Sequence, residues 1–267
     1  MLRNPAVAGQ FYAGDGPGLK AQVEQYVSVN RPKKDAIGIM VPHAGLIYSG
    51  AVAGSVYSSI NFPKTFIMLG PNHTGLGSSI ALMDDGEWKI PGAGVRIDRR
   101  LASRILQGSG IAQRDNNAHM FEHSLEVQLP FISYFSKDTE IVPISLMQAS
   151  YDQCCLLAED IAKAVQSVDY RVVILASSDM SHYLPDRAAR RKDGMAIERI
   201  TAMDHAGLFE TVRRENISMC GMLPATVMLA ASRLLGADHA EVVKYMTSGD
   251  VSGDYDKVVG YAGVIVH

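Results

Sequence analysis

The chain has 267 residues, 47% of them hydrophobic, and a formal net charge of −3 at pH 7. This near-neutral balance gives no electrostatic reason to expect a nucleic-acid partner, and the length suits one α/β domain over residues 1–267. No apolar stretch approaches a membrane span and the first residues lack a secretory signal, so we expect no membrane contact and a cytoplasmic location.

Short apolar runs alternate with longer amphipathic stretches along the chain. In the first half, we predict strands and helices in this order: strand 37–41, helix 50–60, strands 65–69 and 79–83, helices 98–108 and 122–135. In the second half, the order is strand 140–146, helix 151–167, strand 171–176, helices 186–202, 204–215 and 222–235, strands 240–247 and 258–266. Loops are expected near 14–18, 30–35 and 84–94. This alternation favours a single domain with a central, mostly parallel sheet that is flanked by helices.

Three of the predicted strands end in a turn that carries a histidine. Short apolar runs bounded by glycine, proline and serine are typical of strands that are buried in a parallel sheet. Ligands of open α/β sheets bind at the carboxyl ends of the strands. The sequence therefore predicts one polar pocket, either a metal site or an acid–base site, that contains His43, His73 and His182.

His43 and His73 share a local pattern, in which a strand is followed by a proline, the histidine and a glycine. Proline and glycine fix an abrupt turn that directs the side chain to the edge of the sheet. Neutral imidazole is the commonest metal ligand in proteins. For either histidine alone, a hydrogen bond that ties its own loop is the simpler explanation. The repetition of the pattern on two strands favours a shared site.

Asp179 and His182 follow the third of these strands. The two side chains are expected to share a ligand, or the aspartate orients a histidine that binds one. His182 is also a candidate general base, because its ordinary pKa is close to neutral pH. Alternatively, Ser177 and Asp179 are turn residues or cap the following helix, which leaves His182 unexplained.

Glu122, His123 and Glu126 lie in an apolar segment, within the helix predicted near 122–135 that Pro130 is expected to kink. On a helix, the two glutamates share one face. Buried carboxylates need a cation, a metal or a histidine as partner. A solvated first helical turn explains the glutamates equally well, whereas His123 is assigned to the pocket.

Cys220 stands just before the helix predicted near 222–235, where a helix N-terminus lowers a thiol pKa and favours the thiolate that binds metals. A buried, inert cysteine is the alternative. The adjacent cysteines at 154 and 155 are expected to pack inside a helix, and the three cysteines fit a reducing compartment. Four other histidines are expected on the surface without a role: His119, His205, His239 and His267.

Six segments spread over essentially the whole chain match the pattern of one family. They are Arg3–Tyr12, Pro42–Gly50, Gly70–Gly75, Glu122–Glu126, Ser178–Tyr183 and Cys220–Gly221. As a set they are very specific, and on them the chain resembles the Memo family (mediator of receptor-driven cell motility). Prokaryotic relatives are often called AmmeMemoRadiSam system protein B, after a gene neighbourhood with a radical-SAM enzyme.

The resemblance implies a fold similar to that of class III, non-haem iron extradiol dioxygenases. It also implies a metal site whose ligands match His43, His73 and Cys220. Around it would lie Asp179, His182 and His123. Two histidines and a carboxylate hold the iron of the dioxygenases, whereas the third position here matches a thiolate, which prefers softer ions. Iron(II) is therefore the first expected cofactor, with copper or zinc as alternatives.

Three functions remain open on these residues. The first is a metalloprotein with redox or oxygen-dependent chemistry, in which His182 handles protons while Asp179 and His123 orient or tune the site. The second is a non-catalytic pocket that binds a peptide or a protein partner. The third is a dioxygenase-like or metal-dependent hydrolytic enzyme that acts on a small substrate. The expected partners are a small molecule or a peptide in the pocket and a radical-SAM system protein.

Overall fold

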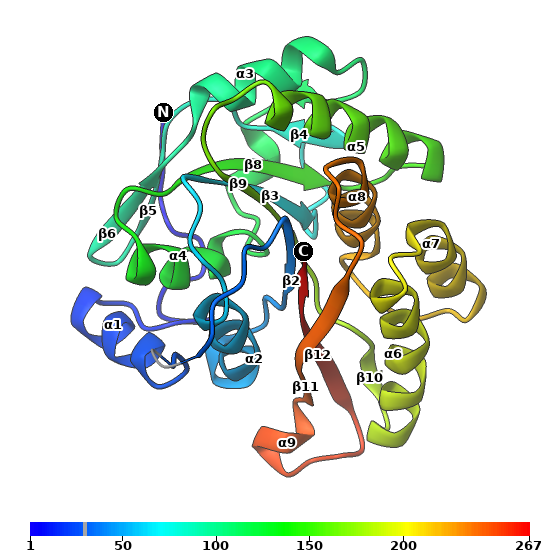
Figure 1. Cartoon of the computed structure of the whole chain (residues 1–267). Helices are drawn as coiled ribbons and strands as arrows, with labels where there is room; N and C mark the ends of the chain where they lie inside the picture. The colour runs from blue at the N-terminus through cyan, green and yellow to red at the C-terminus, as the bar shows by residue number, and fades with distance from the viewer. Residues whose placement is uncertain (29–30) are drawn as a thin grey trace.

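A nine-stranded sheet forms the centre of the computed structural model, which describes residues 1–28 and 31–267 (Figure 1). Its strands are β2 (Gly38–Val41), β3 (Thr65–Pro71), β4 (Ile80–Leu82), β7 (Gln113–Arg114), β8 (Glu140–Leu146), β9 (Val172–Ser177), β10 (His182–Leu184), β11 (Ala240–Thr247) and β12 (Val258–Val266). They are ordered β10-β12-β2-β9-β3-β8-β4-β7, and β11 also pairs with β12. A separate three-stranded sheet consists of β1 (Leu2–Arg3), β5 (Glu87–Ile90) and β6 (Ala93–Arg96).

The large sheet is parallel at its centre and mixed toward its edges. Strands β2, β9, β3 and β8 are parallel neighbours, whereas β12 joins β2 and β4 joins β8 in the antiparallel direction. Every residue of β2, β3 and β9 is buried, as expected for apolar strands that are covered on both faces. The predicted α/β architecture with a central sheet and flanking helices is confirmed.

Helices cover both faces of the sheet (Figure 1). They are α1 (Gly16–Glu24), α2 (Leu46–Ser58), α3 (Arg99–Gly108), α4 (Leu129–Phe135), α5 (Tyr151–Gln166), α6 (Asp186–Thr201), α7 (His205–Arg214), α8 (Met222–Leu234) and α9 (Gly249–Ser252). A side chain at Gly38 of β2 would collide with Met228 of α8, and one at Gly263 of β12 would collide with Val56 of α2. Gly38 pairs with Val266, so these two residues face the same side of the sheet. Gly263 is three residues before Val266 and therefore faces the other side. Helices α8 and α2 thus lie on opposite faces.

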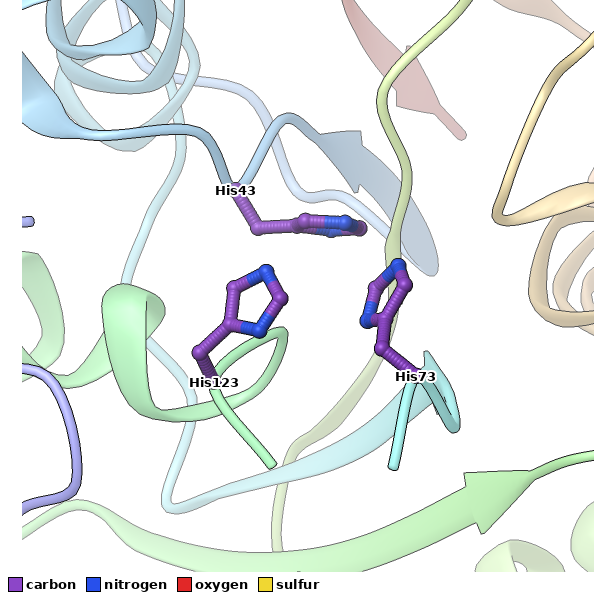
Figure 2. A group of neighbouring side chains, drawn as sticks. All are labelled: His43, His73 and His123. Carbon is purple, nitrogen blue, oxygen red and sulfur yellow. The ribbon is translucent and has the colours of Figure 1, made fainter. Parts of the chain in front are cut away.

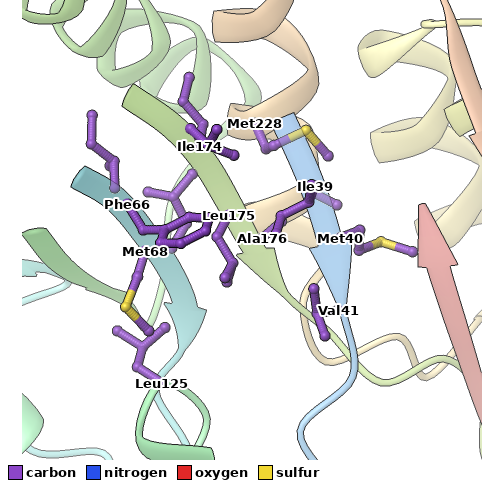
Figure 3. Packing of buried hydrophobic residues seen from close by; sticks show 14 of the residues in the cluster. Ile39, Met40, Val41, Phe66, Met68, Leu125, Ile174, Leu175, Ala176 and Met228 are labelled. Atoms are coloured by element: carbon purple, nitrogen blue, oxygen red, sulfur yellow. The ribbon is translucent and has the colours of Figure 1, made fainter. Parts of the chain in front are cut away.

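The central strands carry the core. Figure 3 shows β2, β9 and β3 side by side, with their apolar side chains in contact above and below the sheet. Ile39, Phe66 and Leu175 are each fully buried, and one cluster of buried hydrophobic residues extends from Tyr12 to Val266. None of the described helices is both long and apolar enough to span a membrane.

Three predicted segments differ from the structure. The helix predicted near 122–135 is wrong over its first half, since a 3₁₀ turn covers Glu126–Gln128 and α4 begins only at Leu129. Pro130 therefore lies in the first turn of α4. Backbone N–H groups in the first turn have no acceptor within the helix, so a proline is tolerated there, and the predicted kink at Pro130 is absent. The loops predicted near 84–94 and 14–18 contain β5, part of β6 and the start of α1. Residue 30 of the predicted loop 30–35 lies outside the described residues.

Candidate metal centre

Three imidazoles meet at the carboxyl ends of the central strands. His43 follows β2, His73 follows β3, and His123 lies in the irregular segment before α4. One nitrogen from each ring lies within 4.8 Å of the other two. Figure 2 shows the three rings pointing toward a common centre. His43 and His73 therefore lie together as predicted and His123 joins them, whereas His182, the third predicted strand-end histidine, is not a member of this group.

A hydrogen-bond network fixes the orientation of the His43 ring. The Ser177 hydroxyl donates its only proton to the carbonyl oxygen of Ser124 at 2.7 Å. It also accepts from Gln128 Nε2 at 2.9 Å, and His43 Nδ1 lies 2.9 Å away. Because that hydroxyl has no second proton to give, His43 Nδ1 must be the donor. The Nε2 atom of His43 therefore carries a free lone pair.

The orientation of Gln128 is itself fixed from two sides. Its amide nitrogen also donates to the carbonyl oxygen of Pro42 at 3.0 Å, and its amide oxygen accepts from the Tyr57 hydroxyl at 3.0 Å. Burial and the neighbouring imidazoles of His123 and His73 hold the pKa of His43 well below its usual value. His43 is consequently neutral, as a metal ligand must be.

Glu122 holds the His73 ring through a buried carboxylate. The Nδ1–H of His73 donates to Glu122 Oε1 at 2.9 Å, and the backbone N–H groups of His123 and Ser124 donate to the same oxygen at 3.0 Å and 2.9 Å. Burial raises the pKa of Glu122, but the hydrogen bond and charge of His73 outweigh it and bring the pKa to about 2. Burial lowers the pKa of His73, but the hydrogen bond and charge of Glu122 outweigh it and raise that pKa, so Nε2 must lose a proton before it can bind a metal in a carboxylate–histidine–metal arrangement.

His123 stacks on one ring and contacts a second at a tilt. Its imidazole lies 4.6 Å from that of His73, at 24° between the ring planes, and the Phe11 ring lies 4.8 Å away. Burial lowers the pKa of His123, while the Glu122 carboxylate opposes that shift. The ring is therefore neutral, and one of its nitrogens lies within 4.8 Å of a nitrogen of each of the other two imidazoles.

Cys220 lies beside His43 and outside the group of three imidazoles. It precedes α8, and its Sγ lies 3.3 Å from His43 Nε2 and accepts from the backbone N–H of Asp179 at 3.3 Å. An imidazole nitrogen and a thiolate sulfur on one tetrahedral ion lie about 3.5 Å apart, so this spacing fits a shared metal. Burial and the Asp179 charge raise the thiol pKa, contrary to the expected effect of the helix N-terminus. A bound cation is needed to favour the thiolate.

Asp179 positions the loop of His43. Its Oδ1 accepts from the backbone N–H of His43 at 2.8 Å, and burial raises its pKa. Helix α6 starts at Asp186 after Pro185, so Asp179 caps no helix there. His182 donates from Nδ1 to the carbonyl oxygen of Ser218 at 2.8 Å, which leaves its Nε2 as the basic atom. Among the described residues, no hydrogen bond joins Asp179 to His182.

Glu126 belongs to a different structure, which sequence reasoning missed. Arg3 is fully buried, lies 4.4 Å above the Trp88 ring, and pairs with the Glu126 carboxylate. The guanidinium also donates to the carbonyl oxygens of Glu122 at 2.7 Å and His119 at 3.1 Å. We call this group the Arg3 clamp. It fixes both ends of the segment that carries His123, and neither glutamate occupies the solvated turn considered above.

The expectation that His119 lies on the surface is wrong. Its side chain is fully buried, its Nε2 lies 3.2 Å from the carbonyl oxygen of Ala81, and burial lowers its pKa to about 4. The Trp88 ring packs against it at 5.7 Å. Of the other three histidines, His239 is exposed, whereas His205 and His267 are half-buried.

Comparison with known proteins identifies the family. The sequence model of the Memo-like protein family matches residues 3–265. The chain belongs to the Memo family. MEMO1 family proteins of Methanopyrus kandleri and Sulfurisphaera tokodaii are 40% and 42% identical to it, each over 99% of both chains. That of Methanosarcina barkeri is 42% identical over 99% of this chain and all of its own.

The Memo-family chain also shares its fold with a solved structure of low sequence similarity. A crystal structure of an Escherichia coli K12 protein superposes with a TM-score of 0.56 at 14% identity. The superposed region covers 85% of the Memo-family chain and 98% of the Escherichia coli chain. At that identity the likeness extends to the fold alone.

Removing the Ser177 hydroxyl tests the network around His43. In Ser177→Ala, we expect metal affinity to fall about 10- to 100-fold, the usual cost of losing the partner of a ligand. Nitrogen-15 NMR of the metal-free protein should show His43 protonated at Nδ1 alone, and a mixture of tautomers in the variant. Ser145→Ala is a matched control, because the buried Ser145 hydroxyl has no hydrogen-bond partner. A single unchanged tautomer in Ser177→Ala would contradict the assignment.

Proposed function

We propose that this Memo-family chain is a metalloprotein that binds one redox-active transition-metal ion through His43, His73 and Cys220, with His123 as a fourth donor. One observation carries the proposal. The free Nε2 of His43 lies 3.3 Å from Cys220 Sγ, and the other two imidazoles gather around the same histidine. His43 is buried, His123 and Cys220 are half-buried and His73 is exposed, and each donor comes from a different segment of the chain.

The donor set narrows the choice of ion. Imidazole suits iron, copper and zinc, while a thiolate adds a preference for softer ions such as copper(I). Iron(II) is the first ion to test and copper(I) the second, with zinc as the redox-inactive comparison. Bound iron or copper would supply electron transfer to or from a small molecule in the pocket.

The other residues of the site have roles that follow from their contacts. His182 has a free Nε2 while its Nδ1 is held by Ser218, so it accepts or delivers a proton at that atom. The Asp179 carboxylate accepts a hydrogen bond from the backbone N–H of His43, and the Asp179 backbone N–H donates to the Cys220 sulfur. Asp179 thereby holds both residues in place. Glu122 keeps the His73 ring in one tautomer.

The proposal is tested by elemental analysis of protein purified without oxygen, followed by anaerobic titration with iron(II) and copper(I). We expect one tightly bound ion per chain. Oxygen uptake by the loaded protein, with and without small aromatic substrates, then distinguishes an oxygen-dependent enzyme from a metal-binding protein. A chain that binds neither ion under any condition would overturn the proposal and turn attention to peptide capture at the same pocket.

Cys220→Ser separates the thiol from the imidazoles. We expect the variant to bind iron(II) with little change and to lose at least about 10-fold in copper(I) affinity, because a hydroxyl replaces the soft ligand. Competition against a chelator of known affinity measures both constants. Cys154→Ser is the matched control, since Cys154 is buried in α5 away from these donors. An unchanged copper(I) affinity would exclude Cys220 as a ligand.

A further inference from the structure

A second group of metal-ligating side chains lies at the other edge of the sheet. His239 directly precedes β11, and His267 directly follows β12. Val266 pairs with Gly38 at the amino end of β2, whereas His43 follows the carboxyl end of that strand. The second group is therefore separated from the candidate metal centre by the length of β2.

The backbone places these side chains on one face. His239 and His267 exchange two backbone hydrogen bonds, of 3.1 Å and 2.9 Å, so they form a directly opposed antiparallel pair whose side chains project to the same side. Glu241 stands two residues after His239 and projects to that side as well. One ligand atom from each of the three side chains lies within 4.8 Å of the other two.

A positive charge already contacts this group. The ammonium of Lys34 donates to Glu241 Oε2 at 2.8 Å and lies 3.4 Å from His267 Nε2. Both partners of the Lys34–Glu241 pair are more than a third exposed, so the pair is weak and readily exchanged. The Nε2 lone pair of His267 and the Glu241 carboxylate therefore both contact the Lys34 ammonium. The His239 ring lies next to this group, 5.0 Å from the ring of His267.

We propose that His239, His267 and Glu241 bind a divalent transition-metal ion of the zinc type, in competition with the Lys34 ammonium. Two imidazoles and one carboxylate are a common ligand set for such an ion. The three side chains are exposed or half-buried, so rotamer changes bring their ligand atoms from the observed spacing to the roughly 3.3 Å of a tetrahedral site. The ion would bridge the start of β11 and the end of β12.

Zinc titration of the full chain tests this assignment. We expect a second, weaker zinc ion per chain in the wild type, and its loss in the double variant His239→Ala/His267→Ala. Lys34→Met should tighten the second ion about fivefold or more, because a like charge near the site is removed. Cobalt(II) separates the two sites, since only the site with Cys220 gives sulfur-to-cobalt charge-transfer absorption.

His205→Ala is the matched control, because His205 is half-buried and hydrogen-bonded to the Tyr151 hydroxyl at 3.0 Å. It should keep both zinc ions, and circular dichroism should show the same fold in every variant. The proposal is wrong if the double variant binds as much zinc as the wild type. It is also wrong if Lys34→Met leaves the affinity for the second ion unchanged.

Discussion

Arg3→Met should lower the free energy of unfolding by about 3–5 kcal/mol, which is the cost of removing one partner of a buried ion pair. The variant leaves the Glu126 carboxylate buried without its cation, although the Tyr12 hydroxyl and two backbone N–H groups still donate to it. It also removes the donor to the carbonyl oxygens of Glu122 and His119. Since the Arg3 clamp fixes the segment that carries His123, metal affinity should fall as well.

Urea unfolding measures the loss in stability. Arg99→Met is the matched control, because the Arg99–Asp85 pair is exposed and contributes at most about 1 kcal/mol. The double variant Arg3→Met/Glu126→Gln should recover part of the loss, since the amide is cheaper to bury than the carboxylate. A loss below about 1 kcal/mol in Arg3→Met would show that the clamp contributes little.

His43→Ala and His73→Ala should each abolish stoichiometric metal binding while the fold stays intact. The loss should exceed about 100-fold in affinity, the upper range for removing a residue that only supports a ligand. His43→Ala deletes the imidazole nearest Cys220, and His73→Ala deletes the one held by Glu122. Elemental analysis after anaerobic loading measures the stoichiometry, and circular dichroism checks the fold.

Two comparisons sharpen this result. His205→Ala should keep its metal, because that ring lies against Tyr151 outside the site. His73→Ala should also lose some stability, since the Glu122 carboxylate then lacks its imidazole partner. One-to-one metal retained in both the His43 and the His73 variants would eliminate these histidines as ligands.

The strand-end histidines could be predicted because their signals are local. An apolar run, a proline and a glycine fix where a strand stops, and parallel strands bring such ends to one edge. The irregular conformation of Glu122–Leu125 could not be predicted in this way. The Glu122 side chain accepts from the N–H groups of His123 and Ser124, which competes with the helix that the apolar pattern favoured.

Other features depend on contacts between distant parts of the chain. Arg3 meets Glu126 across a separation of 123 residues, and a two-residue strand gives no periodic signal for it. The burial of His119 follows from its packing against Trp88, in a hairpin that reads as a polar loop. Apolar runs also do not reveal strand direction, so the antiparallel entry of β12 beside β2 was not foreseen.

That entry of β12 bears on how the protein is made. β12 follows every other strand in the described chain, yet it pairs with β2, β10 and β11. At about 5–20 residues per second, the ribosome completes β12 on the order of 10 to 40 s after β2. During that time the strand that leads to His43 lacks its neighbour on one side, whereas β9 on its other side is completed earlier. We therefore expect the sheet around the strand that leads to His43 to be completed late, in a slow folding step dominated by long-range strand pairing.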